Sequence, residues 1–369
     1  MVQEGARQLA GTKIGPAAID TDKNCMISPD IVDALSELGY LGSYVPEEYS
    51  GAGLDYLSYL IIVEEISKVC ASTGILISAH TSLCCDPILR YGTEEQKKRF
   101  LPQLSAGERI GCFLLTEPEA GSDAANIRTS YREEDDCYAI DGGKIFVTNG
   151  GYRGIGIVFA TKDRSLRHKG ISAFIVDLES KGVEVLKNEK KLGIKGSYTT
   201  AFALDDVRVP KENLLGCEFE GFTIAVETLN GGRIGVAAQA LGIAEGAFDL
   251  SKNYSKERVQ FGKPIAKLQS IQFKLAEMAL RIEASKMLVH KAGWLKANGK
   301  SSALESAMAK TMASETATWV AKEAIQVHGG YGYICEYEVE RMYRDAKITE
   351  IYEGTNEVQR LVIARLLLK

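Results

Sequence analysis

Five short segments combine glycine with hydroxyl, amide or charged side chains in a way that suits chemistry. They read LTEPEAGSD (115–123), KIFVTNGG (144–151), RVQFGKP (258–264), QVHGGYGY (326–333) and IYEGTNE (351–357). The first two lie at the ends of apolar, strand-like runs, where a rigid sheet can present backbone N–H groups to a cofactor. Taken one at a time, each of these two is more often just a turn.

The usual single-motif signatures of catalysis are absent. The chain has no GxGxxG, GxxxxGK[ST], HExxH or GxSxG sequence, which argues against a Rossmann nucleotide site and a serine hydrolase. Its eight cysteines form no CxxC pair and no metal-ligand spacing with the four histidines. We therefore expect no metal and free thiols in a reducing compartment. The adjacent Cys84 and Cys85 are interpreted as small buried side chains on a helix, rather than as a redox pair.

Composition bounds the class of protein. The chain has 369 residues, 45% hydrophobic side chains and a net charge of -5. Basic residues are scattered among acids, so we expect no nucleic-acid partner. No run approaches the ~20 apolar residues of a membrane span, and the first residues lack the apolar core of a secretory signal. We expect a soluble protein of a bacterial cytoplasm, with the mitochondrial matrix as the alternative.

The spacing of apolar residues changes twice along the chain. Residues 1–112 show helical spacing, residues 113–221 consist of short β-rich runs between turns, and residues 222–369 return to long amphipathic helices. We predict an α+β fold in three parts: an N-terminal α-helical domain, a middle antiparallel β-domain and a C-terminal four-helix bundle. These elements must position the five segments.

Jointly, the five segments resemble the acyl-CoA dehydrogenase family, and most closely its short-chain or butyryl-CoA branch, as in DAKITEIYEGT (345–355). The resemblance runs nearly the whole chain, through Leu366. It implies FAD as cofactor, an acyl-CoA substrate, and an electron-transferring flavoprotein as electron acceptor. It also implies a homotetramer built as a dimer of dimers.

The resemblance also assigns residues to the cofactor. In the β-domain the flavin contacts would be Phe113, Leu115, Thr116, Gly121, Ser122, Phe146, Val147 and Thr148. Phe146 would cover the isoalloxazine, and Thr148 would bond near N5. The adenine and phosphate end, partly of a neighbouring subunit's cofactor, would meet Arg258, Phe261, Gln269, Gln326, Gly329 and Gly330, with Thr355 and Glu357 close by. The planar fork of arginine suits phosphate, although an arginine on an amphipathic helix is usually a surface residue.

Removal of a proton next to a thioester needs a positioned carboxylate, donors to the carbonyl oxygen and a hydride acceptor. The resemblance assigns the base to Glu353, with Gly354 beside it allowing close approach of the ligand. Burial should raise its proton affinity. Some relatives place the base immediately before Arg233, where this chain has Gly232. Substrate contacts would include Ser122, Asn230, Arg233, Gly354 and Asp86, although short-chain relatives usually show Asp at position 230.

Asp86, in SLCCDPI (82–88), departs from the short-chain pattern, which has Gly or another uncharged residue there. The first interpretation is a helix cap, because Asp-Pro is a common start of a helix. The second is a carboxylate that faces the acyl chain, for a polar, cyclic or branched acyl group or as an additional base. For the whole protein, an oxidase, an enoyl-CoA reductase on the same fold and a non-catalytic binding scaffold stay open as alternatives.

Overall fold

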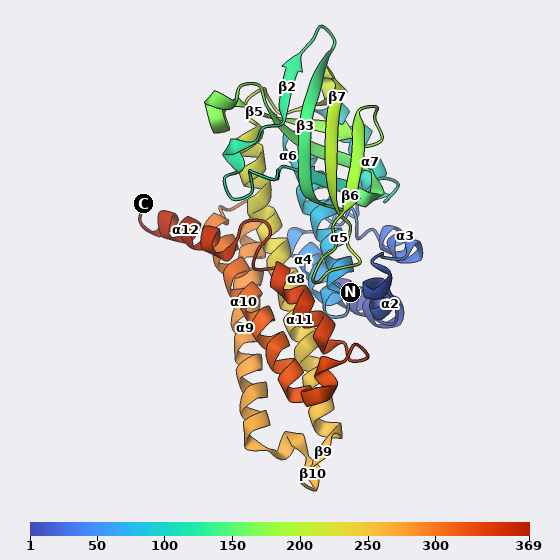
Figure 1. Ribbon diagram of the computed structural model, residues 1–369, viewed down its shortest axis with the longest axis vertical. Helices are drawn as coiled ribbons and strands as arrows, with labels where there is room; N and C mark the ends of the chain where they lie inside the picture. Colours follow the sequence, from blue (N-terminus) through green and yellow to red (C-terminus); the bar gives the residue numbers. More distant parts are fainter.

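The protein is described by a computed structural model that covers residues 1–369. Figure 1 shows a β-sheet at one end of an elongated molecule and long helices that run away from it. Shorter N-terminal helices pack against the side of the long ones. The predicted order of helices, sheet and helices is confirmed.

Seven α-helices form the N-terminal part. They are α1 (Val2–Leu9), α2 (Ala18–Asn24), α3 (Pro29–Glu37), α4 (Tyr56–Ser67), α5 (Ala71–Ala79), α6 (Asp86–Tyr91) and α7 (Glu94–Ser105). Helix α4 begins where the Asp55 side chain accepts a hydrogen bond from the Ser58 N–H. Between α5 and α6 the chain stays helical but widens to a π-helix over His80–Cys85, which the sequence did not predict. Cys84 and Cys85 are buried there, as expected.

The middle part is an eight-stranded, mainly antiparallel sheet. Its strands are β1 (Gly111–Leu114), β2 (Ser130–Glu133), β3 (Cys137–Thr148), β4 (Ile155–Thr161), β5 (Ile171–Asp177), β6 (Val183–Asn188), β7 (Thr199–Pro210) and β8 (Leu214–Leu215). Their order is β6-β7-β3-β2-β4-β5-β8, and β1 pairs in parallel with β4. Every residue of β4 is buried, which explains why its sequence, IGIVFAT, reads as one apolar run.

The C-terminal part is a helical bundle. It comprises α8 (Gly221–Glu257), the small hairpin β9 (Val259–Gln260) and β10 (Lys263–Pro264), α9 (Gln269–Ala297), α10 (Ala303–His328), α11 (Val339–Ile348) and α12 (Asn356–Leu367). Helices α8 to α11 pack together as the predicted four-helix bundle, with α11 much shorter than the others. Helix α12 projects to the side in Figure 1.

One continuous core joins the N-terminal helices to the bundle. It contains 44 buried residues, among them Ile62 of α4, Leu241 of α8 and Ala317 of α10. Two glycines of α8 allow the close approach: a Cβ at Gly242 would lie 2.3 Å from the Glu64 carbonyl oxygen, and one at Gly246 would lie 2.1 Å from that of Lys68. The two helical parts therefore hold each other rigidly. No helix is both long and apolar enough to cross a membrane.

Candidate active site

Glu353 lies in the short connection between α11 and α12, in an unusual backbone conformation. Its φ is 53° and that of Gly354 is 91°, so two successive residues occupy the left-handed region. Such a conformation costs free energy for a residue with a side chain, and it persists only where its surroundings enforce it. The Oε2 atom of Glu353 is buried and has no hydrogen-bond partner. Burial raises the pKa of this carboxyl from 4.5 to about 7, against the opposing charges of Arg233 and Lys310.

Gly232 on α8 faces this carboxylate. A Cβ built on Gly232 would lie 2.2 Å from Glu353 Oε2 and 2.6 Å from Leu83 Cδ2. Both distances are far below van der Waals contact, so only glycine fits between α8, the π-helix and the carboxylate. Position 232 therefore cannot supply a second base.

Three side chains hold the Glu353–Gly354 turn through its carbonyl oxygens. Arg233 Nε donates to Glu353 O at 3.2 Å, and its Nη1 donates to Asn230 Oδ1 at 2.7 Å. Gln359 Nε2 lies 3.3 Å from Glu353 O and 2.8 Å from Gly354 O, and Lys310 Nζ donates to Gly354 O at 3.0 Å. The backbone N–H of Glu353, in contrast, donates no hydrogen bond within the chain.

Asp86 does not cap a helix, so the first interpretation of this residue was wrong. It has helical φ and ψ angles of -57° and -50°, because the π-helix runs directly into α6. Its buried carboxylate lies 3.3 Å from Lys296 Nζ of α9 and 3.7 Å from Arg90 Nη1. Lys296 also lies 4.8 Å from the centre of the Tyr56 ring, close to Gly231 of α8. Asp86 therefore belongs to an ion-pair cluster between α6, α8 and α9.

The two β-domain segments lie next to each other at the edge of the sheet. Ile145 N–H donates to Thr116 O at 2.9 Å, and the register of β3 against β7 shifts between Lys144 and Val147. This bulge gives Phe146 a φ of 59° and leaves its side chain 59% exposed. Val147 points into the core of the sheet, so only its backbone faces outward.

Beneath this edge lies a buried ion pair. Lys144 Nζ donates to Glu117 Oε1 at 2.8 Å and to Leu115 O at 3.1 Å. Glu117 also accepts from the N–H groups of Arg128 and Thr129. The pair fixes the loop that contains Thr116, whose N–H donates no hydrogen bond within the chain, and the same holds for Gly121 and Ser122. Phe113 packs on Phe159 inside the sheet, and Thr148 ends β3 in a half-buried position.

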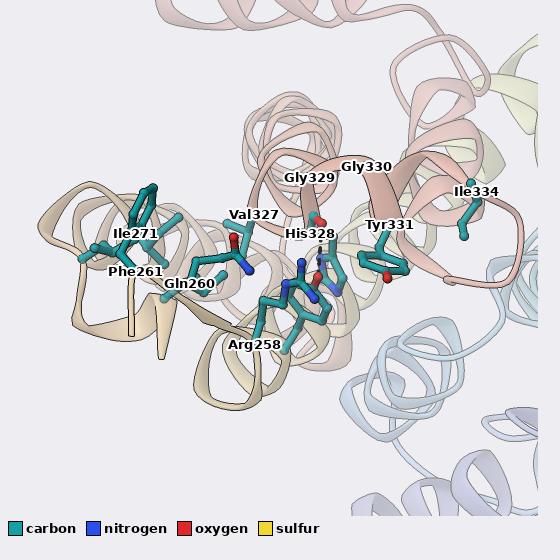
Figure 2. A pocket seen from close by; sticks show the side chains of 13 residues that line it. Arg258, Gln260, Phe261, Ile271, Val327, His328, Gly329, Gly330, Tyr331 and Ile334 are labelled. Carbon is teal, nitrogen blue, oxygen red and sulfur yellow. Dashed lines mark hydrogen bonds between the residues drawn. The ribbon is translucent and has the colours of Figure 1, made fainter. Parts of the chain in front are cut away.

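A separate cavity of about 610 Å³ lies at the far end of the bundle. Figure 2 shows its walls, which include the predicted residues Arg258, Phe261, Gly329 and Gly330. The Arg258 guanidinium lies 5.3 Å from the centre of the Tyr331 ring. Gln269 begins α9 and Gln326 lies near the end of α10; neither lines the cavity, although their neighbours Ile271 and Val327 do.

The predicted cofactor contacts in the β-domain thus lie far from those at the far end of the bundle, while Thr355 and Glu357 lie at the start of α12. The β-domain packs against the first residue of α8, because a Cβ at Gly221 would clash with the Ser172 backbone. Arg258, in contrast, directly follows the last residue of α8. Helix α8 has 37 residues, so its ends are about 55 Å apart at 1.5 Å per residue. Figure 1 shows the hairpin β9–β10 at the opposite end of the molecule from the sheet. A single dinucleotide is too short to reach both groups in one chain.

Comparison with known proteins identifies the class. Residues 1–108 match the N-terminal domain model of acyl-CoA dehydrogenases, residues 112–207 the middle domain and residues 220–368 the C-terminal domain. The chain belongs to the acyl-CoA dehydrogenase family, and the predicted family and fold are confirmed. This family uses FAD.

Three relatives place the chain more narrowly. It is 49% identical to the mitochondrial short-chain specific acyl-CoA dehydrogenase of Rattus norvegicus, over 100% of this chain and 90% of that protein. The solved butyryl-CoA dehydrogenase of Megasphaera elsdenii has a TM-score of 0.97 at 48% identity, covering 100% of this chain and 98% of that one. A chain in a solved structure of the electron transferring flavoprotein of Acidaminococcus fermentans has a TM-score of 0.99 at 48% identity, covering 100% and 97%.

The residues present fit FAD. Unpaired backbone N–H groups at Thr116, Gly121 and Ser122 suit polar and phosphate oxygens, and the outward Phe146 offers an aromatic face. A Cβ at Gly329 or Gly330 would meet open space within the cavity around Arg258. Sequence reasoning missed Lys310, Gln359 and the Asp86–Lys296 pair. Lys310 carried a usable signal, because it falls on the same helical face as Ala313 and Ala317, which are buried.

Proposed function

We propose that this protein catalyses the FAD-dependent α,β-dehydrogenation of a short-chain, butyryl-like acyl-CoA, with Glu353 as the base that removes the α-proton. One observation carries the proposal: a buried carboxylate oxygen without a hydrogen-bond partner packs against a glycine, at a position where any side chain would clash with it. A structural carboxylate would have its acceptors satisfied. This one is held ready to accept a proton.

The geometry suggests how the residues share the work. A carboxyl with a pKa of about 7 is a stronger base than an ordinary glutamate and is still ionised in part at neutral pH. The free N–H of Glu353 is the proposed donor to the thioester oxygen, where negative charge develops. FAD, when bound, supplies the hydride acceptor. Arg233 and Asn230 are proposed to line the thioester end, and Ser122 and Gly354 to contact the substrate.

The proposed electron acceptor is an electron-transferring flavoprotein. The occurrence of a very similar chain in a structure of such a flavoprotein supports this partner. The alternatives are an oxidase and an enzyme that runs as an enoyl-CoA reductase. Turnover of butyryl-CoA in air, with and without an electron-transferring flavoprotein, separates the dehydrogenase from the oxidase. Peroxide release at the rate of turnover would favour the oxidase, and dependence on the flavoprotein would favour the dehydrogenase. Faster reduction of crotonyl-CoA than oxidation of butyryl-CoA would favour the reductase.

We infer a homotetramer arranged as a dimer of dimers. The 55 Å separation of the two cofactor half-sites supports at least a dimer, in which the cavity around Arg258 serves the flavin of another copy. In addition, α9 carries an apolar line at every seventh residue, with Phe273, Leu280, Met287 and Trp294 exposed by 65%, 67%, 60% and 49%. Such a line is typical of a helix that packs against another helix. Sedimentation equilibrium of the flavin-loaded protein tests the assembly.

A second candidate substrate class is a cyclic or branched acyl-CoA. It is favoured by Asp86, whose buried carboxylate pairs with Lys296 near Tyr56, on the same side of α8 as Gly231. In this alternative Asp86 acts as an additional carboxylate or base of the acyl pocket. The test is kcat/KM for butyryl-CoA and a cyclic acyl-CoA in the parent protein and in Asp86→Gly. Unchanged relative preference in Asp86→Gly would exclude the role.

A further inference from the structure

Lys310 is a fully buried lysine in the middle of the bundle. Its Nζ donates to Gly354 O at 3.0 Å and to Asn356 Oδ1 at 2.9 Å, and it forms no ion pair with a carboxylate. A buried ammonium without such a partner is costly, so it indicates a specific role. Both of its acceptors belong to the segment that directly follows Glu353.

The segment depends on this contact for its shape. Glu353 and Gly354 both have left-handed φ angles, and neither belongs to a helix or strand that would impose them. Lys310 belongs to α10, and one turn further along the same helix Ser314 Oγ accepts a hydrogen bond from Asn356 Nδ2 at 3.0 Å. Helix α10 thus contacts the segment that follows the proposed base at two positions, Lys310 and Ser314.

The following proposal rests on the proposed role of Glu353 as base. We propose that Lys310 is a positioning residue of the dehydrogenation, which holds the Glu353–Gly354 turn against α10 and places a positive charge near the carboxylate of Glu353. Because Lys310 is fully buried, it does not touch the substrate itself. Its effect is exerted through Glu353.

The electrostatics agree with this geometry. Burial lowers the pKa of Lys310 to about 8, and among the surrounding charges Glu353 opposes this most strongly. In turn, Lys310 and Arg233 oppose the rise in the pKa of Glu353 that burial causes. The other titratable groups whose charges interact with this pair are Tyr56, Tyr59, Glu350, Tyr352 and Glu357. Lys310 and Arg233 are the cations whose charges act on Glu353.

The test compares Lys310→Met, which keeps the length but removes the charge and the donors, with Lys310→Arg, which keeps the charge. In Lys310→Met we expect retained flavin, a kcat lower by about 10- to 100-fold, a nearly unchanged KM, and an acid limb of kcat/KM shifted upward by about one pH unit. In Lys310→Arg the acid limb stays in place. Lys322→Met, on the same helix but exposed, is the matched control and should change none of these.

A second readout does not depend on turnover. Infrared difference titration follows the protonated carboxyl of Glu353, identified by its absence in Glu353→Gln, and its midpoint should rise in Lys310→Met. If Glu353→Gln kept full turnover, the assignment of the base would fail, whatever the midpoint did. If Glu353→Gln were inactive but Lys310→Met kept the parent kcat and midpoint, only the role of Lys310 would fail.

Should Lys310→Met not fold, Asn356→Ala decides the question. This variant removes one of the two hydrogen-bond acceptors of the Lys310 ammonium but keeps the positive charge of Lys310. The proposal then requires a lower kcat without a shift of the acid limb, and an unchanged kcat would overturn it.

Discussion

Replacement of Glu353 by glutamine should stabilise the protein at high pH, and the size of the effect follows from the structure. The folded-state pKa of Glu353 is about 7, against an ordinary value of 4.5, because the carboxyl is buried. Between these pH values the folded protein retains a proton that the unfolded chain has released. The stability that this proton contributes is therefore fully present below pH 4.5 and is lost as the pH rises through 7.

The gap of about 2.5 pH units corresponds to about 3 kcal/mol of lost stability above pH 7, at 1.36 kcal/mol per unit. Because glutamine does not titrate, Glu353→Gln does not lose this stability as the pH rises. With an unfolding entropy of about 2.1 cal/mol/K per residue, 3 kcal/mol in a chain of 369 residues amounts to about 4 °C in Tm. We expect the Tm difference between Glu353→Gln and the parent to change by about 4 °C in favour of the variant between pH 4.5 and pH 8.

Thermal unfolding of both flavin-loaded proteins across this pH range, followed by calorimetry, is the assay. Glu357→Gln is the control, because Glu357 is exposed and its pKa is lowered rather than raised. It should show no such gain at high pH. A Tm difference between Glu353→Gln and the parent that did not vary with pH would refute the buried, proton-retaining carboxyl from which the base was inferred.

Three further predictions follow from the same geometry. The kcat/KM for acyl-CoA should fall about tenfold per pH unit below pH 7, because Glu353 must be ionised to accept a proton; a profile flat down to pH 5 would contradict this. Gly232→Ala should lower kcat by about 10- to 100-fold, since its Cβ would lie 2.2 Å from Glu353 Oε2, and stopped-flow flavin reduction measures this loss. Leu280→Glu should weaken self-association by placing a charge on the exposed apolar line of α9; an unchanged sedimentation profile would remove that face from the interface.

Much of this organisation could be predicted from the sequence, because local signals carry it. The three-part fold follows from the change of apolar spacing, and Gly232, before Arg233, already indicated that no base stands at that point of α8. The observed close approach of Gly232 to Glu353 explains why glycine is required there.

What escaped prediction depends on contacts between distant segments. Asp86 looked like a helix cap because Asp-Pro commonly starts a helix, but the preceding π-helix continues into α6 and leaves no free end to cap. The helical spacing of Lys310 from the buried Ala313 and Ala317 could have indicated that Lys310 is buried, but its contact with Gly354 depends on the packing of α10 against the segment after Glu353. The outward turn of Phe146 arises from a β-bulge, which the apolar pattern of β3 does not encode.

Anaerobic titration of the flavin-loaded protein with butyryl-CoA, followed by the absorbance of the oxidised flavin, tests the central claim most directly. We predict that the parent protein bleaches, and that Glu353→Gln keeps its flavin and binds the substrate but does not bleach. Bleaching of Glu353→Gln at the parent rate would contradict the assignment of Glu353 as the base.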